Sequence, residues 1–232
     1  MHYLTIDTST TIVVGVCQVH MGEFRELAVS SSDSTREHAE KLAPLVREVM
    51  EKTGIDAPDA VIVGTGPGAF TGLRAGLVTA RTLARAWGVP VYGVSSLEVV
   101  GLAAADRGAQ EIVPMIDARR REVYAMRLRP MGADDVTPLA PYSVMKPADL
   151  TQILGRQPAV VATTNPDLYP ELGEEPGAER EVVQISPAVM ARLVESRLAR
   201  IAAGEELTLD TEPLYLRRPD THGGSPQPAA TA

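Results

Sequence analysis

The sequence contains little of several residue types, and each shortage excludes a class of protein. Cys17 is the single cysteine among 232 residues, so an internal disulfide cannot form and a disulfide scaffold is excluded. None of the four histidines has another histidine four residues away, so the helical zinc-binding pattern is absent. No apolar run approaches about 18 residues, and no signal-peptide pattern opens the chain. We therefore expect a cytoplasmic protein with neither a membrane span nor a metal site.

Positive charge is also scarce. The chain has 22 lysines and arginines against 30 aspartates and glutamates, which gives a formal net charge of −8. Phosphate backbones are bound by basic surfaces, so an acidic chain is a poor nucleic-acid binder by itself. If the protein acts on RNA, we expect a partner to supply most of the contact. The 44% hydrophobic and 22% charged residues are typical of a soluble globular protein.

The sequence does contain an alternation of strands and helices that repeats once. An apolar strand that ends in aspartate opens each half, at Asp7 and Asp117. Hydrophobic periodicity predicts strands at 3–7, 11–19, 23–30, 59–63, 89–94, 112–117, 122–129 and 158–163. It predicts helices at about 35–52, 70–87, 95–107, 147–154 and 186–203. This order indicates an α/β protein built from mixed sheets with helices on their faces.

We expect three regions: an N-terminal lobe at 1–108, a reduced C-terminal lobe at 109–219 and a disordered tail at 220–232. Residues 165–181 form a long excursion rich in proline, glycine and glutamate, with no predicted element. Two capping boxes are predicted at helix starts, one by Ser34 with Glu37 and the other by Ser95 with Glu98.

The most distinctive stretch is residues 64–87, GTGPGAFTGLRAGLVTARTLARAW. Its three glycines at every second position, Gly64, Gly66 and Gly68, require a tight turn or positive φ. In the helix that follows, small residues recur at four-residue spacing and share one face. Each interior glycine lowers helix stability by roughly 1 kcal/mol, which is usual where another backbone comes close. We infer that this helix is pressed against another element.

These motifs, in this order, resemble the TsaB (YeaZ) family. The family is a shortened branch of the actin-like ATPase superfamily, historically grouped with glycoprotease homologues. The glycine block is the most specific match, and the matches span nearly the whole chain. They are IDTST at 6–10, REHAEKLAPLV at 36–46, GTGPGAFTGLRAG at 64–76, GVPVYGVSSLE at 88–98, DARRREVY at 117–124 and PLYLR at 213–217.

The resemblance implies a fold of two RNase H-like (actin-like ATPase) lobes, the second reduced. It also implies a role in making threonylcarbamoyladenosine, a modification of the adenine beside the anticodon of certain tRNAs. In that pathway a TsaB-like subunit pairs with a longer TsaD-like subunit, which carries the chemistry, and a TsaE-like ATPase joins them. We expect a noncatalytic subunit that reaches tRNA only through the complex and forms a homodimer when its partner is absent.

The partner interface is expected on two helices, at about 35–52 and 70–87. The apolar residues of the first cover an arc of about 160°, wider than the usual surface-helix stripe, which suggests burial on two sides. Gly76→Leu is expected to break partner binding while the chain stays folded. The expected interface residues are His38, Leu42, Leu45, Val49, Gly72, Leu73, Gly76, Leu77 and Ala80.

The two aspartates allow two interpretations. The superfamily grips ATP phosphates with two aspartate-containing hairpins, so a weak ATP or ADP site is one hypothesis. Ser9 and Arg119 stand where a glycine is expected, and a side chain there hinders close approach to a phosphate. In the other interpretation both aspartates simply cap turns. The candidate nucleotide-binding residues are Asp7, Thr8, Ser9, Gly66, Gly68 and Asp117.

The resemblance implies no metal site and no catalytic residue. The TsaD-like subunit has a His-x-Glu-x-His segment, whose matching residues here run from Ser96 to Val100 and contain no histidine. The rival hypothesis is an ATPase or phosphotransferase that acts alone with Mg-ATP, using Asp7 and Asp117. A peptidase, suggested by the old glycoprotease label, lacks both metal ligands and a recognisable nucleophile.

Overall fold

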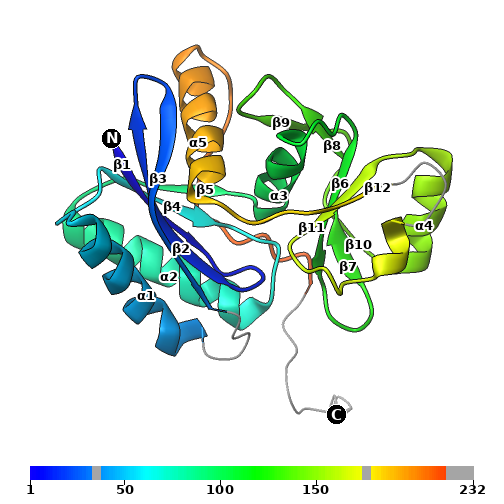
Figure 1. The fold of residues 1–232 in the computed structure, drawn as a ribbon, viewed down its shortest axis with the longest axis horizontal. Helices are drawn as coiled ribbons and strands as arrows, with labels where there is room; N and C mark the ends of the chain where they lie inside the picture. The colour runs from blue at the N-terminus through cyan, green and yellow to red at the C-terminus, as the bar shows by residue number, and fades with distance from the viewer. Residues whose placement is uncertain (33–37, 174–178, 218–232) are drawn as a thin grey trace, which may run out of the picture.

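Two mixed β-sheets organise the chain in the computed structural model, which describes residues 1–32, 38–173 and 179–217 (Figure 1). The first sheet has the order β3-β2-β1-β4-β5, and the expected antiparallel meander forms its first three strands. β4 and β5 add in parallel to β1. The strands are β1 (His2–Asp7), β2 (Ile12–His20), β3 (Glu23–Ser32), β4 (Ala60–Gly64) and β5 (Val91–Val94).

The second sheet has shorter strands than expected. The predicted strand 122–129 is wrong as a single element, because it breaks at Arg127, whose guanidinium donates to the carbonyls of Gln157 and Pro158. On either side of the break, β7 pairs with β6 and β10, whereas β8 pairs mainly with β9. The elements are β6 (Ile112–Asp117), β7 (Val123–Ala125), β8 (Leu128–Pro130), β9 (Val136–Pro138), β10 (Ser143–Met145), β11 (Val160–Thr163), the 3₁₀ turn η1 (Pro170–Gly173) and β12 (Glu179–Val182).

The two halves repeat the same strand geometry at their aspartates. β1 ends at Asp7 and pairs antiparallel with β2, so that Asp7 lies opposite Val13. β6 ends at Asp117 and pairs antiparallel with β7, so that Asp117 lies opposite Val123. In each half a parallel strand, β4 or β11, pairs with the other side. The expected equivalence of the two aspartates is therefore confirmed at the level of register.

Helices form layers on and between the sheets (Figure 1). α1 and α2 cover the outer face of the first sheet, and α4 lies over the second sheet beside η1. Between the sheets lie α3, which packs on β6 and β8, and α5, which packs on β1, β2 and β3. The helices are α1 (His38–Thr53), α2 (Phe70–Trp87), α3 (Ser96–Ala105), α4 (Pro147–Arg156) and α5 (Pro187–Ala202).

Each helix between the sheets packs on the sheet of the other half of the chain. α3 belongs to the first half of the sequence but packs on the second sheet, and α5 does the reverse. The largest hydrophobic cluster consequently draws on both sheets and on both helices. The lobe boundary expected at residue 108 therefore stays a prediction, because α3 before it packs on β6 after it.

Residues 208–217, the C-terminal strap, return to the first sheet after α5. The Gly93 amide donates to the Leu209 carbonyl at 2.8 Å, and the Leu214 amide donates to the Thr65 carbonyl at 2.9 Å. Gly93 is needed here because a Cβ would overlap the Asp210 carbonyl. The strap thus covers the β5 edge of the sheet, which would otherwise expose unpaired backbone groups.

Some expectations lie outside the described residues: the capping box of Ser34 with Glu37, the side chain of His38 and the tail at 220–232. Within the described ranges, no helix has the length and apolar character needed to cross a membrane.

The element against which α2 is pressed is the turn after β1. A Cβ at Gly76 would overlap the Oγ1 of Thr8, a buried hydroxyl without a hydrogen-bond partner in the described chain. The small-residue line of α2 therefore packs on the chain's own fold. A leucine side chain has no space there, so we now expect Gly76→Leu to destabilise the isolated chain.

This contact predicts a stability difference between two helical glycines. We expect Gly76→Ala to lower the free energy of unfolding by about 2 kcal/mol, since overpacking exceeds the gain in helix propensity. Gly155→Ala in α4 is the matched control: nothing lies within 4 Å of its Cβ position, so the change should be neutral or stabilising. Urea unfolding of each variant measures the difference. Equal effects of the two substitutions would contradict the packing argument.

Candidate functional site

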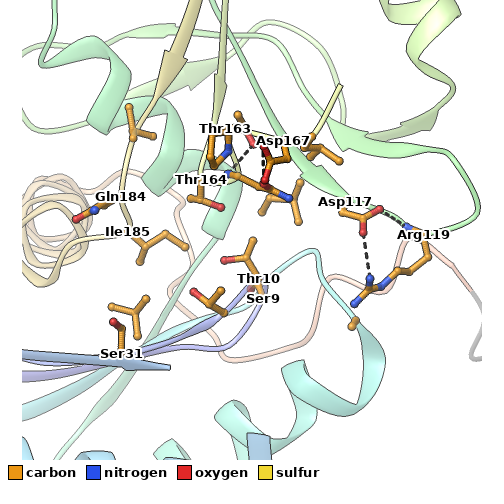
Figure 2. Close-up of a pocket in the computed structure, with 18 of the residues that line it drawn as sticks. Ser9, Thr10, Ser31, Asp117, Arg119, Thr163, Thr164, Asp167, Gln184 and Ile185 are labelled. Atoms are coloured by element: carbon orange, nitrogen blue, oxygen red, sulfur yellow. Dashed lines mark hydrogen bonds and ion pairs between the residues drawn. The ribbon is translucent and has the colours of Figure 1, made fainter. Parts of the chain in front are cut away.

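A cleft of about 690 Å³ lies between the two lobes, at the ends of β1 and β6 (Figure 2). Ser9, Thr10 and Ser31 face it from the first lobe, and the β6–β7 turn and the loop after β11 face it from the second. Its lining is rich in hydroxyl groups and also includes apolar side chains such as Val29 and Ile185. A space of this size and mixed polarity can hold a small polar molecule.

Asp7 ends β1 but points into the protein. Its side chain is fully buried and does not line the cleft. The Ser96 hydroxyl donates to Oδ2 at 2.5 Å, and the Ser9 amide donates to Oδ1 at 2.8 Å. Burial raises the pKa of Asp7, and the bonds from Ser96 and Ser9 oppose that shift. The Asp7 carboxyl group therefore joins Ser9 and Ser96 inside the fold.

The glycine loop packs against this same turn. A Cβ at Gly64 would overlap the Asp7 carboxylate, and one at Gly68 would lie 2.6 Å from the Ser9 carbonyl oxygen. Gly66 has φ of 93°, and its carbonyl accepts from the Ser96 amide at 2.8 Å. The three glycines thus let the loop close onto Asp7 and Ser9. The Asp7 carboxylate is thus enclosed by the loop and by Ser96 and does not face the cleft, so it does not fit the role of a direct ligand to a magnesium-bound nucleotide.

The predicted capping box at α3 is also wrong, because both of its side chains bond to other segments. The Ser95 hydroxyl donates to the Gly66 carbonyl at 3.1 Å and makes no cap bond. Glu98, expected to complete the box, pairs instead with Arg197 of α5 at 2.8 Å. Both side chains join α3 to distant segments, which local spacing does not reveal.

Asp117 occupies the equivalent turn in the second lobe but faces the cleft (Figure 2). Its Oδ1 accepts from the Arg119 amide at 2.7 Å, as Asp7 accepts from Ser9, so both aspartates cap turns as the second interpretation predicts. Arg119, Arg120 and Arg121 all have positive φ, of 62°, 53° and 61°. L-residues rarely adopt this conformation, and three of them in succession fold the turn back sharply.

Comparison with known proteins decides the family. The model of a family described as "TsaD: tRNA N6-adenosine threonylcarbamoyltransferase" matches residues 29–168, more than half of the chain. The tRNA threonylcarbamoyladenosine biosynthesis protein TsaB of Escherichia coli is 28% identical, over 94% of this chain and 95% of its own length. This chain belongs to the TsaB/YeaZ family.

Two further relatives extend this finding. An uncharacterized protein of Mycobacterium tuberculosis is 33% identical, over 94% of this chain and 92% of its own length. The solved structure of YeaZ from Pseudomonas aeruginosa superposes with a TM-score of 0.71 at 26% identity, covering 93% of this chain and 99% of that one. The expected RNase H-like fold of the TsaB/YeaZ family is thereby confirmed.

In this TsaB/YeaZ-family chain, most of the expected interface residues face inward. Leu42 and Val49 of α1 are buried on the chain's own first sheet, and Leu45 is half-buried. The stripe of α2 is buried on the same sheet, and the interface expected on it stays a prediction. A stripe at i, i+3, i+4 and i+7 is how a helix covers its own sheet, whether or not a partner exists. Its buried residues are Gly72, Leu73, Gly76, Leu77, Ala80 and Ala84, of which all but Ala84 were expected at the interface.

The outer face of α2 carries the arginines, and their contacts with the C-terminal strap are what sequence reasoning missed. Val78 is 61% exposed, among the most exposed large apolar side chains described. Arg74 stacks on Phe70, 4.3 Å from the ring centroid, and donates to the Tyr215 hydroxyl at 3.1 Å. Arg81 donates to Thr211 and pairs with Glu212. The sequence shows the charge of this face, since α2 has three arginines and no acidic residue in an acidic chain.

Residues 96–100, which match the His-x-Glu-x-His segment expected in a TsaD-like subunit, are all buried. Ser96 is fully buried against Asp7, and Val100 lies in the hydrophobic core between the sheets. Across residues 1–32, 38–173 and 179–217, no group of three histidine, cysteine, aspartate or glutamate side chains is placed to hold a metal ion.

The environment of Asp7 predicts a pH-dependent stability difference. Because the folded chain raises the pKa of Asp7, it holds the Asp7 proton more tightly than the unfolded chain does, and stability falls as pH rises above about 4. We expect Asp7→Asn, which cannot ionise, to gain stability relative to the native chain over that range. Urea unfolding at a series of pH values measures this difference, and a difference independent of pH would contradict it.

Proposed function

We propose that this chain is a noncatalytic subunit in tRNA threonylcarbamoyladenosine biosynthesis, pairing with a TsaD-like catalytic subunit. The assignment to this pathway follows from relatives named TsaB in Escherichia coli and Haemophilus influenzae. A corynebacterial tRNA N6-adenosine threonylcarbamoyltransferase also shares 41% identity over 64 residues, so a TsaD-related enzyme and this chain have a common segment.

The observation that carries the noncatalytic role is the bond between Ser96 and Asp7. The superfamily's metal and nucleotide chemistry would need a free carboxylate at Asp7, and the TsaD-like chemistry would need a ligand at position 96. Here the hydroxyl at 96 donates to that carboxylate at 2.5 Å, and both groups are buried. The two groups satisfy each other, which supports a structural role for both.

The outer face of α1 and α2 is the proposed docking surface for the TsaD-like partner. Val78 is exposed there between Arg74 and Arg85, and neither arginine has a carboxylate partner within the described chain. Arginine and apolar groups together are typical of protein interfaces, whereas RNA phosphates favour denser positive charge. The partner is expected to present carboxylates opposite these arginines. The same face could support a homodimer when the partner is absent.

We further propose that the chain needs no nucleotide of its own, and that tRNA and a TsaE-like ATPase are reached through the complex. The enclosure of the Asp7 carboxylate supports this part of the proposal. Calorimetry with ATP tests it: heat of binding to the chain alone, lost in Asp7→Asn, would favour the rival ATPase instead.

Reconstitution tests the main proposal. The purified chain, the TsaD-like protein of the same organism and their mixture are each supplied with tRNA and the remaining pathway components. We expect threonylcarbamoyladenosine to form only where the TsaD-like protein is present, with this chain increasing its yield. Modification by this chain alone, or no effect of the chain on the partner, would refute the proposal.

A surface substitution tests the docking surface. We expect Val78→Asp to weaken binding to the TsaD-like protein roughly tenfold or more, because it places a charge in an apolar contact. Ile153→Asp on α4 is the matched control, since this side chain is also exposed, at 40%, but lies on the other lobe. Calorimetric titration of each variant gives the affinities. If both variants bind like the native chain, the surface lies elsewhere.

A further inference from the structure

The C-terminal strap holds the first lobe through Tyr215. The Tyr215 ring lies against Phe70 with centroids 4.9 Å apart, and its hydroxyl accepts from Arg74. Phe70 begins α2 directly after Ala69, which lines the cleft. This contact therefore fastens the strap to the first-lobe rim of the cleft.

Two residues later the strap holds the second lobe. Arg217 forms an ion pair with Glu122, and both side chains are about one-quarter exposed. Glu122 is part of the sharp β6–β7 turn, since its amide donates to the Arg119 carbonyl at 3.0 Å and its carbonyl accepts from Ala118. Arg119 lines the cleft from this turn. Among the residues that the structure describes, the strap therefore reaches the second-lobe rim through the Arg217–Glu122 ion pair.

We propose that residues 215–217 form an interlobe latch that holds the two rims of the cleft at a fixed separation. Tyr215 anchors the latch on α2, and the Arg217–Glu122 pair closes it. Only Leu216 separates the two anchors, so the rims cannot move far apart while both contacts persist. Opening the cleft requires release of one of them, and an ion pair is the contact that a competing charge can release. This inference does not depend on the proposed pathway.

The interlobe distance of the isolated chain tests the latch. Cys17 is fully buried, so spin labels attach selectively to cysteines introduced at exposed positions. Val78→Cys places one label on α2, and Ile153→Cys places the other on α4 of the second lobe. Pulsed electron resonance then reports the distribution of distances between the lobes. In the native background we expect one narrow distribution.

Release of the latch should add a longer component to that distribution. We expect this in Glu122→Gln, in Arg217→Gln and in Tyr215→Ala. The double variant Glu122→Gln with Arg217→Gln should match the single variants, because one ion pair can be lost only once. Hydrogen exchange at the Leu214 amide, which donates to Thr65, should also become roughly twofold to fivefold faster.

A matched control separates latch release from general loosening. Glu48→Gln removes an ion pair with Lys52 that lies within α1, so it should leave the distance distribution unchanged. Unchanged exchange within α1 in the latch variants shows that they remain folded. The proposal is overturned if the three latch variants keep the native distribution, or if the effects of Glu122→Gln and Arg217→Gln add.

Discussion

The close packing of the glycine loop 64–68 on the turn after β1 is the constraint on which the other features of this molecule depend. It buries the Asp7 carboxyl group, and a buried polar group must have hydrogen-bond partners within reach. One donor comes from the turn itself and the other from Ser96 at the start of α3. Three segments that are distant in sequence therefore meet at one carboxylate. Their meeting sets the direction in which α3 leaves the first sheet.

That direction explains why the lobes are interleaved. α3 crosses to the second sheet, and α5 crosses back to the first, so the layer between the sheets is shared. Arg197 of α5 joins this layer to its surroundings, since it bonds both Glu98 of α3 and the fully buried Asp135. Breaking one partner of such a cluster would leave an uncompensated buried charge, which favours the single arrangement seen here.

Local patterns predicted the elements well where they are long and periodic. The β1–β3 meander, α2 and the paired aspartate turns all follow from residues within a short window. The strands β9, β10 and β12 have only three or four residues, too few for a period to show. The direction in which α2 faces could not be read either. Its small-residue line serves the contact with Thr8, and two of its arginines, Arg74 and Arg81, contact a strap about 130 residues or more later.

This assignment of the two faces of α2 changes what a partner can recognise. The space beside Gly76 is already filled by Thr8 of the chain's own turn, which holds α2 in place. Only the outer face of α2 is left for a partner to bind. A helix fixed on a sheet and bonded along its flank by the strap has little freedom to lose on binding. Rigid presentation lowers the entropy cost of association. In the proposed complex, the close packing at Asp7 would therefore contribute to affinity without touching the partner, by keeping α2 in one orientation.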